Sequence, residues 1–308
     1  MSVSAVRAAA LVTAVLAAAP LALDPSAARA TGTAGEIDEV AVDGPSFTRK
    51  PRWELGVGGG VFFGRDYPAS NDPNRRAIAL PFLVYRSPVF RIGGGSVRAV
   101  AIERPRLRLD LSVGASFSAS SEDNGSRDGM PDLDFLFELG PQLELRLIDR
   151  VAGEDGRVQL GFVAELRAVV ATDFRGIGAQ GFVAEIGVEA ARRRVFDTGL
   201  DVVGALGVTF ADERLQDYFY EVEPEYARPA RAAYDARGGY LGTELSLGVV
   251  IRPSETLRVF LGVQSGLYAG AANEESPLFE TTASTGAALG VAWTFARSAR
   301  TIDIVEID

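Results

Sequence analysis

From Asp132 to Arg146 the chain alternates between apolar and polar residues, and this alternation limits the folds that it can adopt. Leu133 and Phe135 occupy odd positions, whereas Glu138 and Glu144 occupy even ones. A period of two places the two sets on opposite faces of one β-strand. The segment exceeds the usual strand of about five or six residues, and about 9–11 residues already cross a bilayer. The pattern therefore predicts a transmembrane β-barrel, apolar towards lipid and polar towards the lumen.

The same alternation recurs and predicts an all-β fold, an antiparallel up-and-down barrel of twelve strands, an even number as in other single-chain bacterial barrels. The predicted strands are 53–63, 78–86, 89–94, 97–103, 105–117, 132–148, 157–171, 181–194, 199–211, 238–251, 257–268 and 284–295. Long connections alternate with short ones, as expected for surface loops and periplasmic turns. The count requires a tight turn at Gly93-Gly94-Gly95. If 89–103 formed a single strand, the later loops would invert.

The two ends of the chain differ from the barrel. Arg7 precedes an apolar run, Ala8–Leu23, and Ala28-Arg29-Ala30 follows as a cleavage site, so residues 1–30 are predicted to be a signal peptide that is removed. We expect 31–52 to be a periplasmic lead-in without strands, 53–296 the barrel and 297–308 a tail. The alternation at 301–307 fits either a short extra strand or a periplasmic extension. These features predict the outer membrane of a diderm bacterium.

Composition excludes several kinds of chemistry. The chain has no His and no Cys, which excludes a Ser-His triad, a His-ligated metal, thiol catalysis and disulfides. The net charge of -10 makes nucleic acid an improbable partner. Ser121–Asp128 has the composition of a calcium loop but lacks its spacing and terminal Glu. We therefore expect a solvated turn there, and no cofactor or metal.

The polar strand faces place nine charged residues towards the lumen. They are Asp110, Glu138, Glu144, Arg146, Glu165, Arg167, Glu185, Glu189 and Glu244. They form either a charged pore that prefers cations or an Arg–carboxylate ladder that fills a narrow interior. The ladder is favoured, because side chains and loops can occlude much of a twelve-stranded lumen. Catalysis by paired carboxylates is disfavoured, because the sequence indicates no cleft, nucleophile or metal signature.

The longest predicted outer loop, 212–237, is rich in aromatic residues. It carries Tyr218, Phe219, Tyr220, Tyr226 and Tyr234. Exposed, these side chains would bind a ligand or a surface. Alternatively, they would form the outer aromatic girdle and cover the mouth of the barrel. The sequence leaves both open.

Several short motifs resemble the MipA/OmpV family of outer-membrane proteins. Asp66-Tyr67-Pro68-Ala69-Ser70-Asn71-Asp72 is similar to the family's D-Y-x-G-S-D stretch, with Ala69 in place of its Gly. Pro81 and Tyr85 follow, then Arg127–Asp134 and Glu138-Leu139-Gly140-Pro141. Tyr234-Asp235-Ala236, Gly238-Gly239 and Glu275-Ser276-Pro277-Leu278 come near the end. The order and spacing of these motifs, from Trp53 to Phe295, carry the resemblance.

The resemblance implies a barrel without enzymatic activity. Family members are described as scaffolds that link a lytic murein transglycosylase to a penicillin-binding protein, and others as adhesins or osmoregulated surface proteins. The expected partners are therefore outer-membrane lipid and lipopolysaccharide, together with these two murein enzymes. The alternatives are a small-solute channel that prefers cations and an adhesin acting through loop 212–237. No catalytic residue is carried over from the family.

Overall fold

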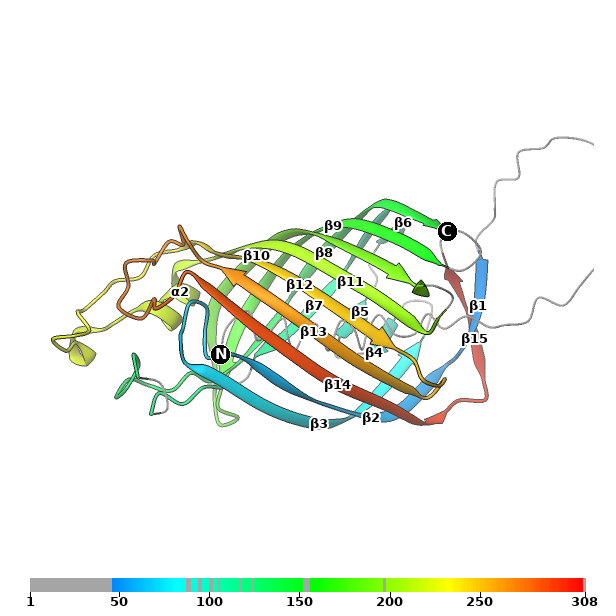
Figure 1. The fold of residues 1–308 in the computed structure, drawn as a ribbon, viewed down its shortest axis with the longest axis horizontal. Coiled ribbons are helices and arrows are strands. Elements are labelled where there is room, and N and C mark those ends of the chain that lie inside the picture. Colours follow the sequence, from blue (N-terminus) through cyan, green and yellow to red (C-terminus); the bar gives the residue numbers. More distant parts are fainter. Residues whose placement is uncertain are drawn as a thin grey trace, which may run out of the picture.

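The computed structural model describes residues 46–86, 90–93, 96–99, 102–104, 106–116, 118–122, 125–151, 156–195 and 198–306 (Figure 1). Its elements are β1 (Ser46–Pro51), β2 (Trp53–Arg65), β3 (Pro73–Arg86), β4 (Phe90–Gly93), β5 (Ser96–Ala99), β6 (Ile102–Arg104), β7 (Leu107–Ser116), β8 (Phe135–Val151), β9 (Arg157–Thr172), β10 (Ile177–Arg193), β11 (Leu200–Ala211), α2 (Glu213–Tyr220), the 3-10 helix η2 (Pro224–Tyr226), β12 (Gly239–Ile251), β13 (Leu257–Leu267), β14 (Ala283–Arg297) and β15 (Thr301–Glu306). Among these residues, no helix is long and apolar enough to cross a membrane.

Thirteen of the strands form one antiparallel sheet that closes into a barrel. The order runs from β5 through β4 and β3 to β2, which pairs with β14. From β14 each strand pairs with the preceding one in the sequence, as far as β6. β2 and β14, the first and last strands of the barrel sheet in the sequence, pair with each other and close the ring, with Gly60 opposite Gly290. β5 and β6 stand at the two ends of this order and are separated by only two residues in the chain. Counted as one strand, they give a barrel of twelve strands, the predicted number. The predicted barrel is confirmed.

The segment 89–103 contains a hairpin instead of one continuous strand, as the twelve-strand count requires, and β6 follows β5 after two residues. β4 and β5 pair as an antiparallel hairpin, with Gly93 opposite Ser96. Both are short, at four residues each. The later loops therefore keep their predicted orientation, with the long ones at the end that carries α2 (Figure 1).

The strands present an apolar band outward. In β8, the odd-numbered residues from Phe137 to Leu145, Pro141 included, are exposed, while the even-numbered residues between them are at least partly buried. Aromatic side chains mark both ends of this band. Phe210 and Tyr240 lie together at the α2 end, and Trp293 and Phe295 at the other. This is the arrangement of a lipid-facing barrel wall with interfacial aromatic girdles.

Three differences from the predictions affect the ends of the chain and the outer loops. The lead-in contains a strand, because β1 pairs antiparallel with β15 in a separate two-stranded sheet. This pairing shows that the alternation in the tail is a short extra strand, and no local sequence signal in 46–51 reveals its partner. β3 begins at Pro73 rather than 78, and β10 at Ile177 rather than 181, so the predicted long loop 172–180 shortens to 173–176. The predicted signal peptide and residues 31–45 lie outside the described residues.

Candidate functional site

Arg167 is the centre of an ionic cluster on the inner face of the barrel. Its Nε donates to Glu138 Oε2 at 2.8 Å, its Nη1 contacts Glu165, and its Nη2 lies 3.5 Å from Glu185 Oε2. The three carboxylates come from β8, β9 and β10, so one guanidinium joins three neighbouring strands. Glu138 has only 2 % of its surface exposed. A buried carboxylate requires such a partner, because burying an unpaired charge is costly.

A second ionic ladder runs across the inner face nearer the short turns. Arg108 pairs with Glu144, and Arg146 lies 3.5 Å from the same carboxylate. Further round the barrel, Arg157 donates to Asp149 at 2.8 Å. The ladder continues through Asp201, which accepts from Arg252 at 2.6 Å and lies 3.7 Å from Arg193.

The ladder depends on a β-bulge that the sequence analysis missed. The register between β8 and β9 shifts between Arg146 and Ile148, so Leu147 is the extra residue. Leu147 and Ile148 are both exposed, and Asp149 then turns inward to reach Arg157. A strict period of two would have placed Asp149 on the lipid face. The signal was present as two adjacent apolar residues followed by an acid, which a bulge accommodates.

The other predicted lumen residues lie apart from the Arg167 cluster. The backbone places Asp110 opposite Gln142 of β8. Glu189 is on the same face of β10 as Glu185 but is exposed. Glu244 is buried on β12, opposite Gly207 and Gly266. The structure therefore brings Glu138, Glu165, Arg167 and Glu185 into one cluster, and Glu144 and Arg146 into the second.

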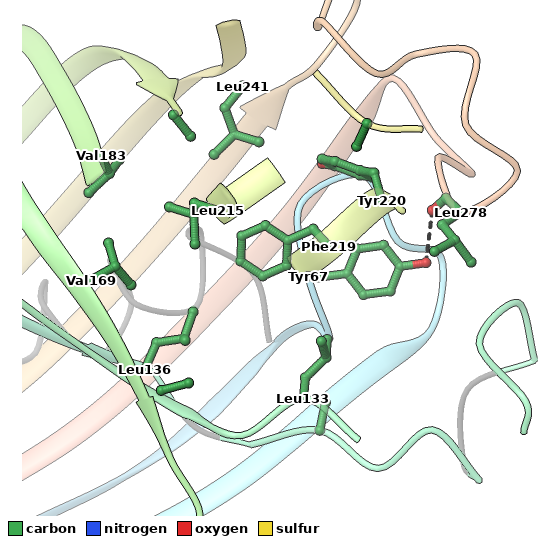
Figure 2. Close-up of a cluster of buried hydrophobic side chains, with 14 of the residues drawn as sticks. Tyr67, Leu133, Leu136, Val169, Val183, Leu215, Phe219, Tyr220, Leu241 and Leu278 are labelled. Carbon is green, nitrogen blue, oxygen red and sulfur yellow. Dashed lines mark hydrogen bonds between the residues drawn. The ribbon is translucent and has the colours of Figure 1, made fainter. Parts of the chain in front are cut away.

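A hydrophobic cluster fills the outer end of the barrel (Figure 2). Leu215, Phe219 and Tyr220 of α2 are at most 1 % exposed. They pack with inward-facing residues at the outer ends of the strands and with residues of the neighbouring loops. These residues include Leu136, Val169, Val183, Leu241, Tyr67, Leu133 and Leu278. Of the two predicted roles of the aromatic loop, covering the mouth is correct for Phe219 and Tyr220.

Hydrogen bonds tie four outer loops into this cap, which we define by its described residues, 66–72, 118–122 with 125–134, 212–238 and 268–282. The Tyr67 hydroxyl donates to Leu278 O at 2.8 Å (Figure 2), and the Tyr220 hydroxyl to Pro68 O at 2.8 Å. Arg127 donates to Phe219 O at 3.2 Å. Burial raises the pKa of Tyr67 and Tyr220, so both hydroxyls stay protonated and remain donors. The four loops therefore form one unit that is joined by hydrogen bonds between them.

The position where the chain departs from the family motif lies inside this cap. Ala69 is fully buried and has a positive φ of 61°, a conformation that glycine adopts without steric cost. Its carbonyl accepts from the amides of Glu280 and Thr281. The family's glycine fits this backbone, and the two hydrogen bonds hold Ala69 in it.

No metal centre is found in the described part of the chain, where no group of three or more His, Cys, Asp and Glu residues is arranged to hold an ion. In the calcium-like loop, the Ser121 amide donates to Asp132 Oδ1 at 2.7 Å, which is a loop-closing contact. Asp123 and Asn124 of that loop lie outside the described residues.

Comparisons with known proteins identify a family and several similar solved structures. The family model described as MltA-interacting protein MipA matches residues 57–295. Among solved structures, LpxR from Salmonella typhimurium is similar at 11% identity and a TM-score of 0.39, covering 79% of this chain and 99% of that one. A bacterial polysaccharide outer membrane secretin is similar at 9% identity and a TM-score of 0.38, covering 79% and 98%.

The outer membrane protease OmpT from Escherichia coli is similar at 11% identity and a TM-score of 0.28, covering 81% and 98%. A comparison with curated protein sequences found no match. The family match covers most of the barrel, from β2 to β14. The chain is therefore an outer-membrane β-barrel that belongs to the MipA family.

Proposed function

We propose that this protein is a non-enzymatic scaffold of the cell envelope that binds a periplasmic murein transglycosylase. The observation that carries the proposal is the cap, because buried Leu215, Phe219 and Tyr220 fill the outer end of the barrel with apolar side chains. A barrel filled in this way is better suited to holding partners than to passing polar solutes. The name of the family, which refers to interaction with MltA, supports a partner of this class.

The short-turn end offers a suitable docking element. β1 and β15 form a two-stranded sheet at that end, separate from the barrel sheet (Figure 1). Strand edges accept further strands through backbone hydrogen bonds. We propose that the murein transglycosylase docks on this sheet, and that a penicillin-binding protein and lipopolysaccharide are further partners of the same scaffold.

Binding of a purified murein transglycosylase to the refolded barrel tests this proposal. We expect deletion of 298–308, which removes β15, to weaken binding about tenfold or more, since the sheet loses one strand. Substitutions confined to η2 in the outer loop are the control and should leave binding unchanged. The proposal is wrong if no murein enzyme binds the full chain, or if the deletion leaves binding intact while the barrel still migrates as a folded protein.

The alternative is a small-solute channel that prefers cations. It is favoured by the three carboxylates around Arg167, which leave that cluster with an excess of negative charge. The adhesin alternative has less support, because the loop 212–237 buries Phe219 and Tyr220 instead of displaying them.

A further inference from the structure

β4 and β5 complete the ring of strands near the short turns, but beside the rest of β3 the barrel wall is left open. β3 pairs with β2 along its whole length, from Pro73 to Tyr85. On its other side β4 meets only Tyr85 and Arg86. Within the described residues, Pro73–Val84 therefore have no strand partner on that side. This edge lies on the outer-loop side of the short β4–β5 hairpin, because β3 runs from the outer loops towards the short turns.

The open edge is poorly suited to another strand. Pro73 and Pro81 lie in β3 and have no backbone N–H to donate, and proline is a common means by which natural edge strands avoid strand addition. Unpaired backbone groups at membrane depth are tolerated only where protein buries them or where they line a water-filled cavity. An occupant that needs few backbone hydrogen bonds fits this edge better than a second chain.

The inner face of β3 beside this edge is apolar, unlike the charged inner faces of β8–β10. Ile78, Leu80 and Phe82 lie opposite Gly60, Gly58 and Gly56 of β2. Leu80 is 57% exposed although it faces inward. The Phe82 ring lies over Gly56, where it leaves no room for a β-carbon, and Val84, the next residue on this face, is buried.

A cationic side chain lies at the outer end of the same face. Arg76 is exposed and donates one hydrogen bond to Ser118 O at 3.1 Å, and a guanidinium has five donors in all. From Arg76 to Phe82 the strand extends about 20 Å, at about 3.3 Å per residue. One face of β3 thus has a positive charge at one end and an apolar run that continues from it.

We propose that this inner face of β2 and β3 binds a long-chain anionic amphiphile that enters from the outer leaflet through the open edge of β3. The carboxylate pairs with Arg76, and the alkyl chain lies along Ile78 and Leu80 as far as Phe82. Entry is lateral because the cap fills the outer mouth. This site is independent of the scaffold function, which concerns the opposite end of the barrel.

Photocrosslinking with a diazirine-labelled palmitate tests the proposal on the full protein in phosphatidylethanolamine nanodiscs. We expect labelling of the β3 peptide to fall about fivefold or more in Leu80→Asn and in Arg76→Gln, since each removes one of the two contacts. Leu83→Asn is the matched control, because Leu83 is 50% exposed on the opposite, lipid-facing side of the same strand. It should keep its labelling.

Three outcomes would overturn the proposal. The first is equal labelling of wild type and Leu80→Asn, and the second is equal loss in Leu83→Asn, which would indicate adsorption to the outer wall. The third is a crosslink between the β3 strands of two copies, which would assign the edge to a second chain. Heat-modifiable migration confirms folding of each variant, and Arg76→Gln keeps the test decisive if Leu80→Asn does not fold.

Discussion

Arg167 has a structural importance that its place in the sequence does not reveal. Nothing distinguishes it there from Arg146 or Arg157, yet its guanidinium contacts three carboxylates on three strands. Each acid would repel the other two if the guanidinium were absent, and Glu138 is almost fully buried. Removing one partner from such a group leaves an uncompensated buried charge, which costs more than the pair contributes when intact.

Arg167→Gln should therefore destabilise the barrel by about 3 kcal/mol. The measurement is the urea concentration at which heat-modifiable migration is lost. Arg228→Gln is the control, because Arg228 pairs with Asp128 where both side chains are at least half exposed, and its loss should cost no more than about 0.5 kcal/mol. Equal urea midpoints for the two variants would show that the Arg167 cluster is solvated and contributes no more to stability than the exposed Arg228–Asp128 pair.

At the scale of the element, α2 combines an apolar face with a concentration of acids. Asp212 caps its N-terminus by accepting from the Leu215 amide at 3.1 Å. Burial, with repulsion from Glu221, Glu213, Asp235 and Asp212, raises the pKa of Asp217 from 3.8 to about 6. The folded cap thus binds a proton more tightly than the unfolded loop, so the charged form of Asp217 opposes folding.

Cap stability should consequently depend on pH. The folded pKa lies above the unfolded one, so the cap gains stability as the pH falls through about 6 towards 3.8, and loses it as the pH rises through the same range. Limited proteolysis within 212–238 should be slower at pH 5 than at pH 7. Asp217→Asn should be resistant at both pH values. Identical cleavage rates of the wild type at the two pH values would contradict this account.

The elements divide into those that local pattern predicts and those that depend on distant partners. Period-two alternation was enough to predict the long strands, and the resulting count survived the short β4 and β5. β1 was missed because its partner, β15, lies at the other end of the chain. The inward turn of Asp149 was missed because it depends on the bulge at Leu147. The burial of Phe219 depends on four loops meeting, which no single loop encodes.

For the whole molecule, the cap and the ionic ladders act in series along the barrel. The apolar cluster fills the outer end, and the Arg167 cluster lies on the inner face below it, since Glu138 follows Leu136 on the same face of β8. A solute crossing the barrel would have to displace the apolar cluster and then pass the Arg167 cluster. The inward-facing side chains are mostly charged along β8–β10 and mostly apolar along β3. These features favour a folded barrel that holds partners and does not conduct.

Conductance in planar bilayers tests this view of the whole molecule. Wild type should insert and give no stable steps. Replacing Asp212–Val222 with a Gly-Ser linker removes the side chains of Leu215, Phe219 and Tyr220, so steps should appear. The matched control replaces η2 of the same loop, which buries no residue, and should stay silent. Stable cation-selective steps in wild type would instead assign the protein to the channels and make the cap a gate.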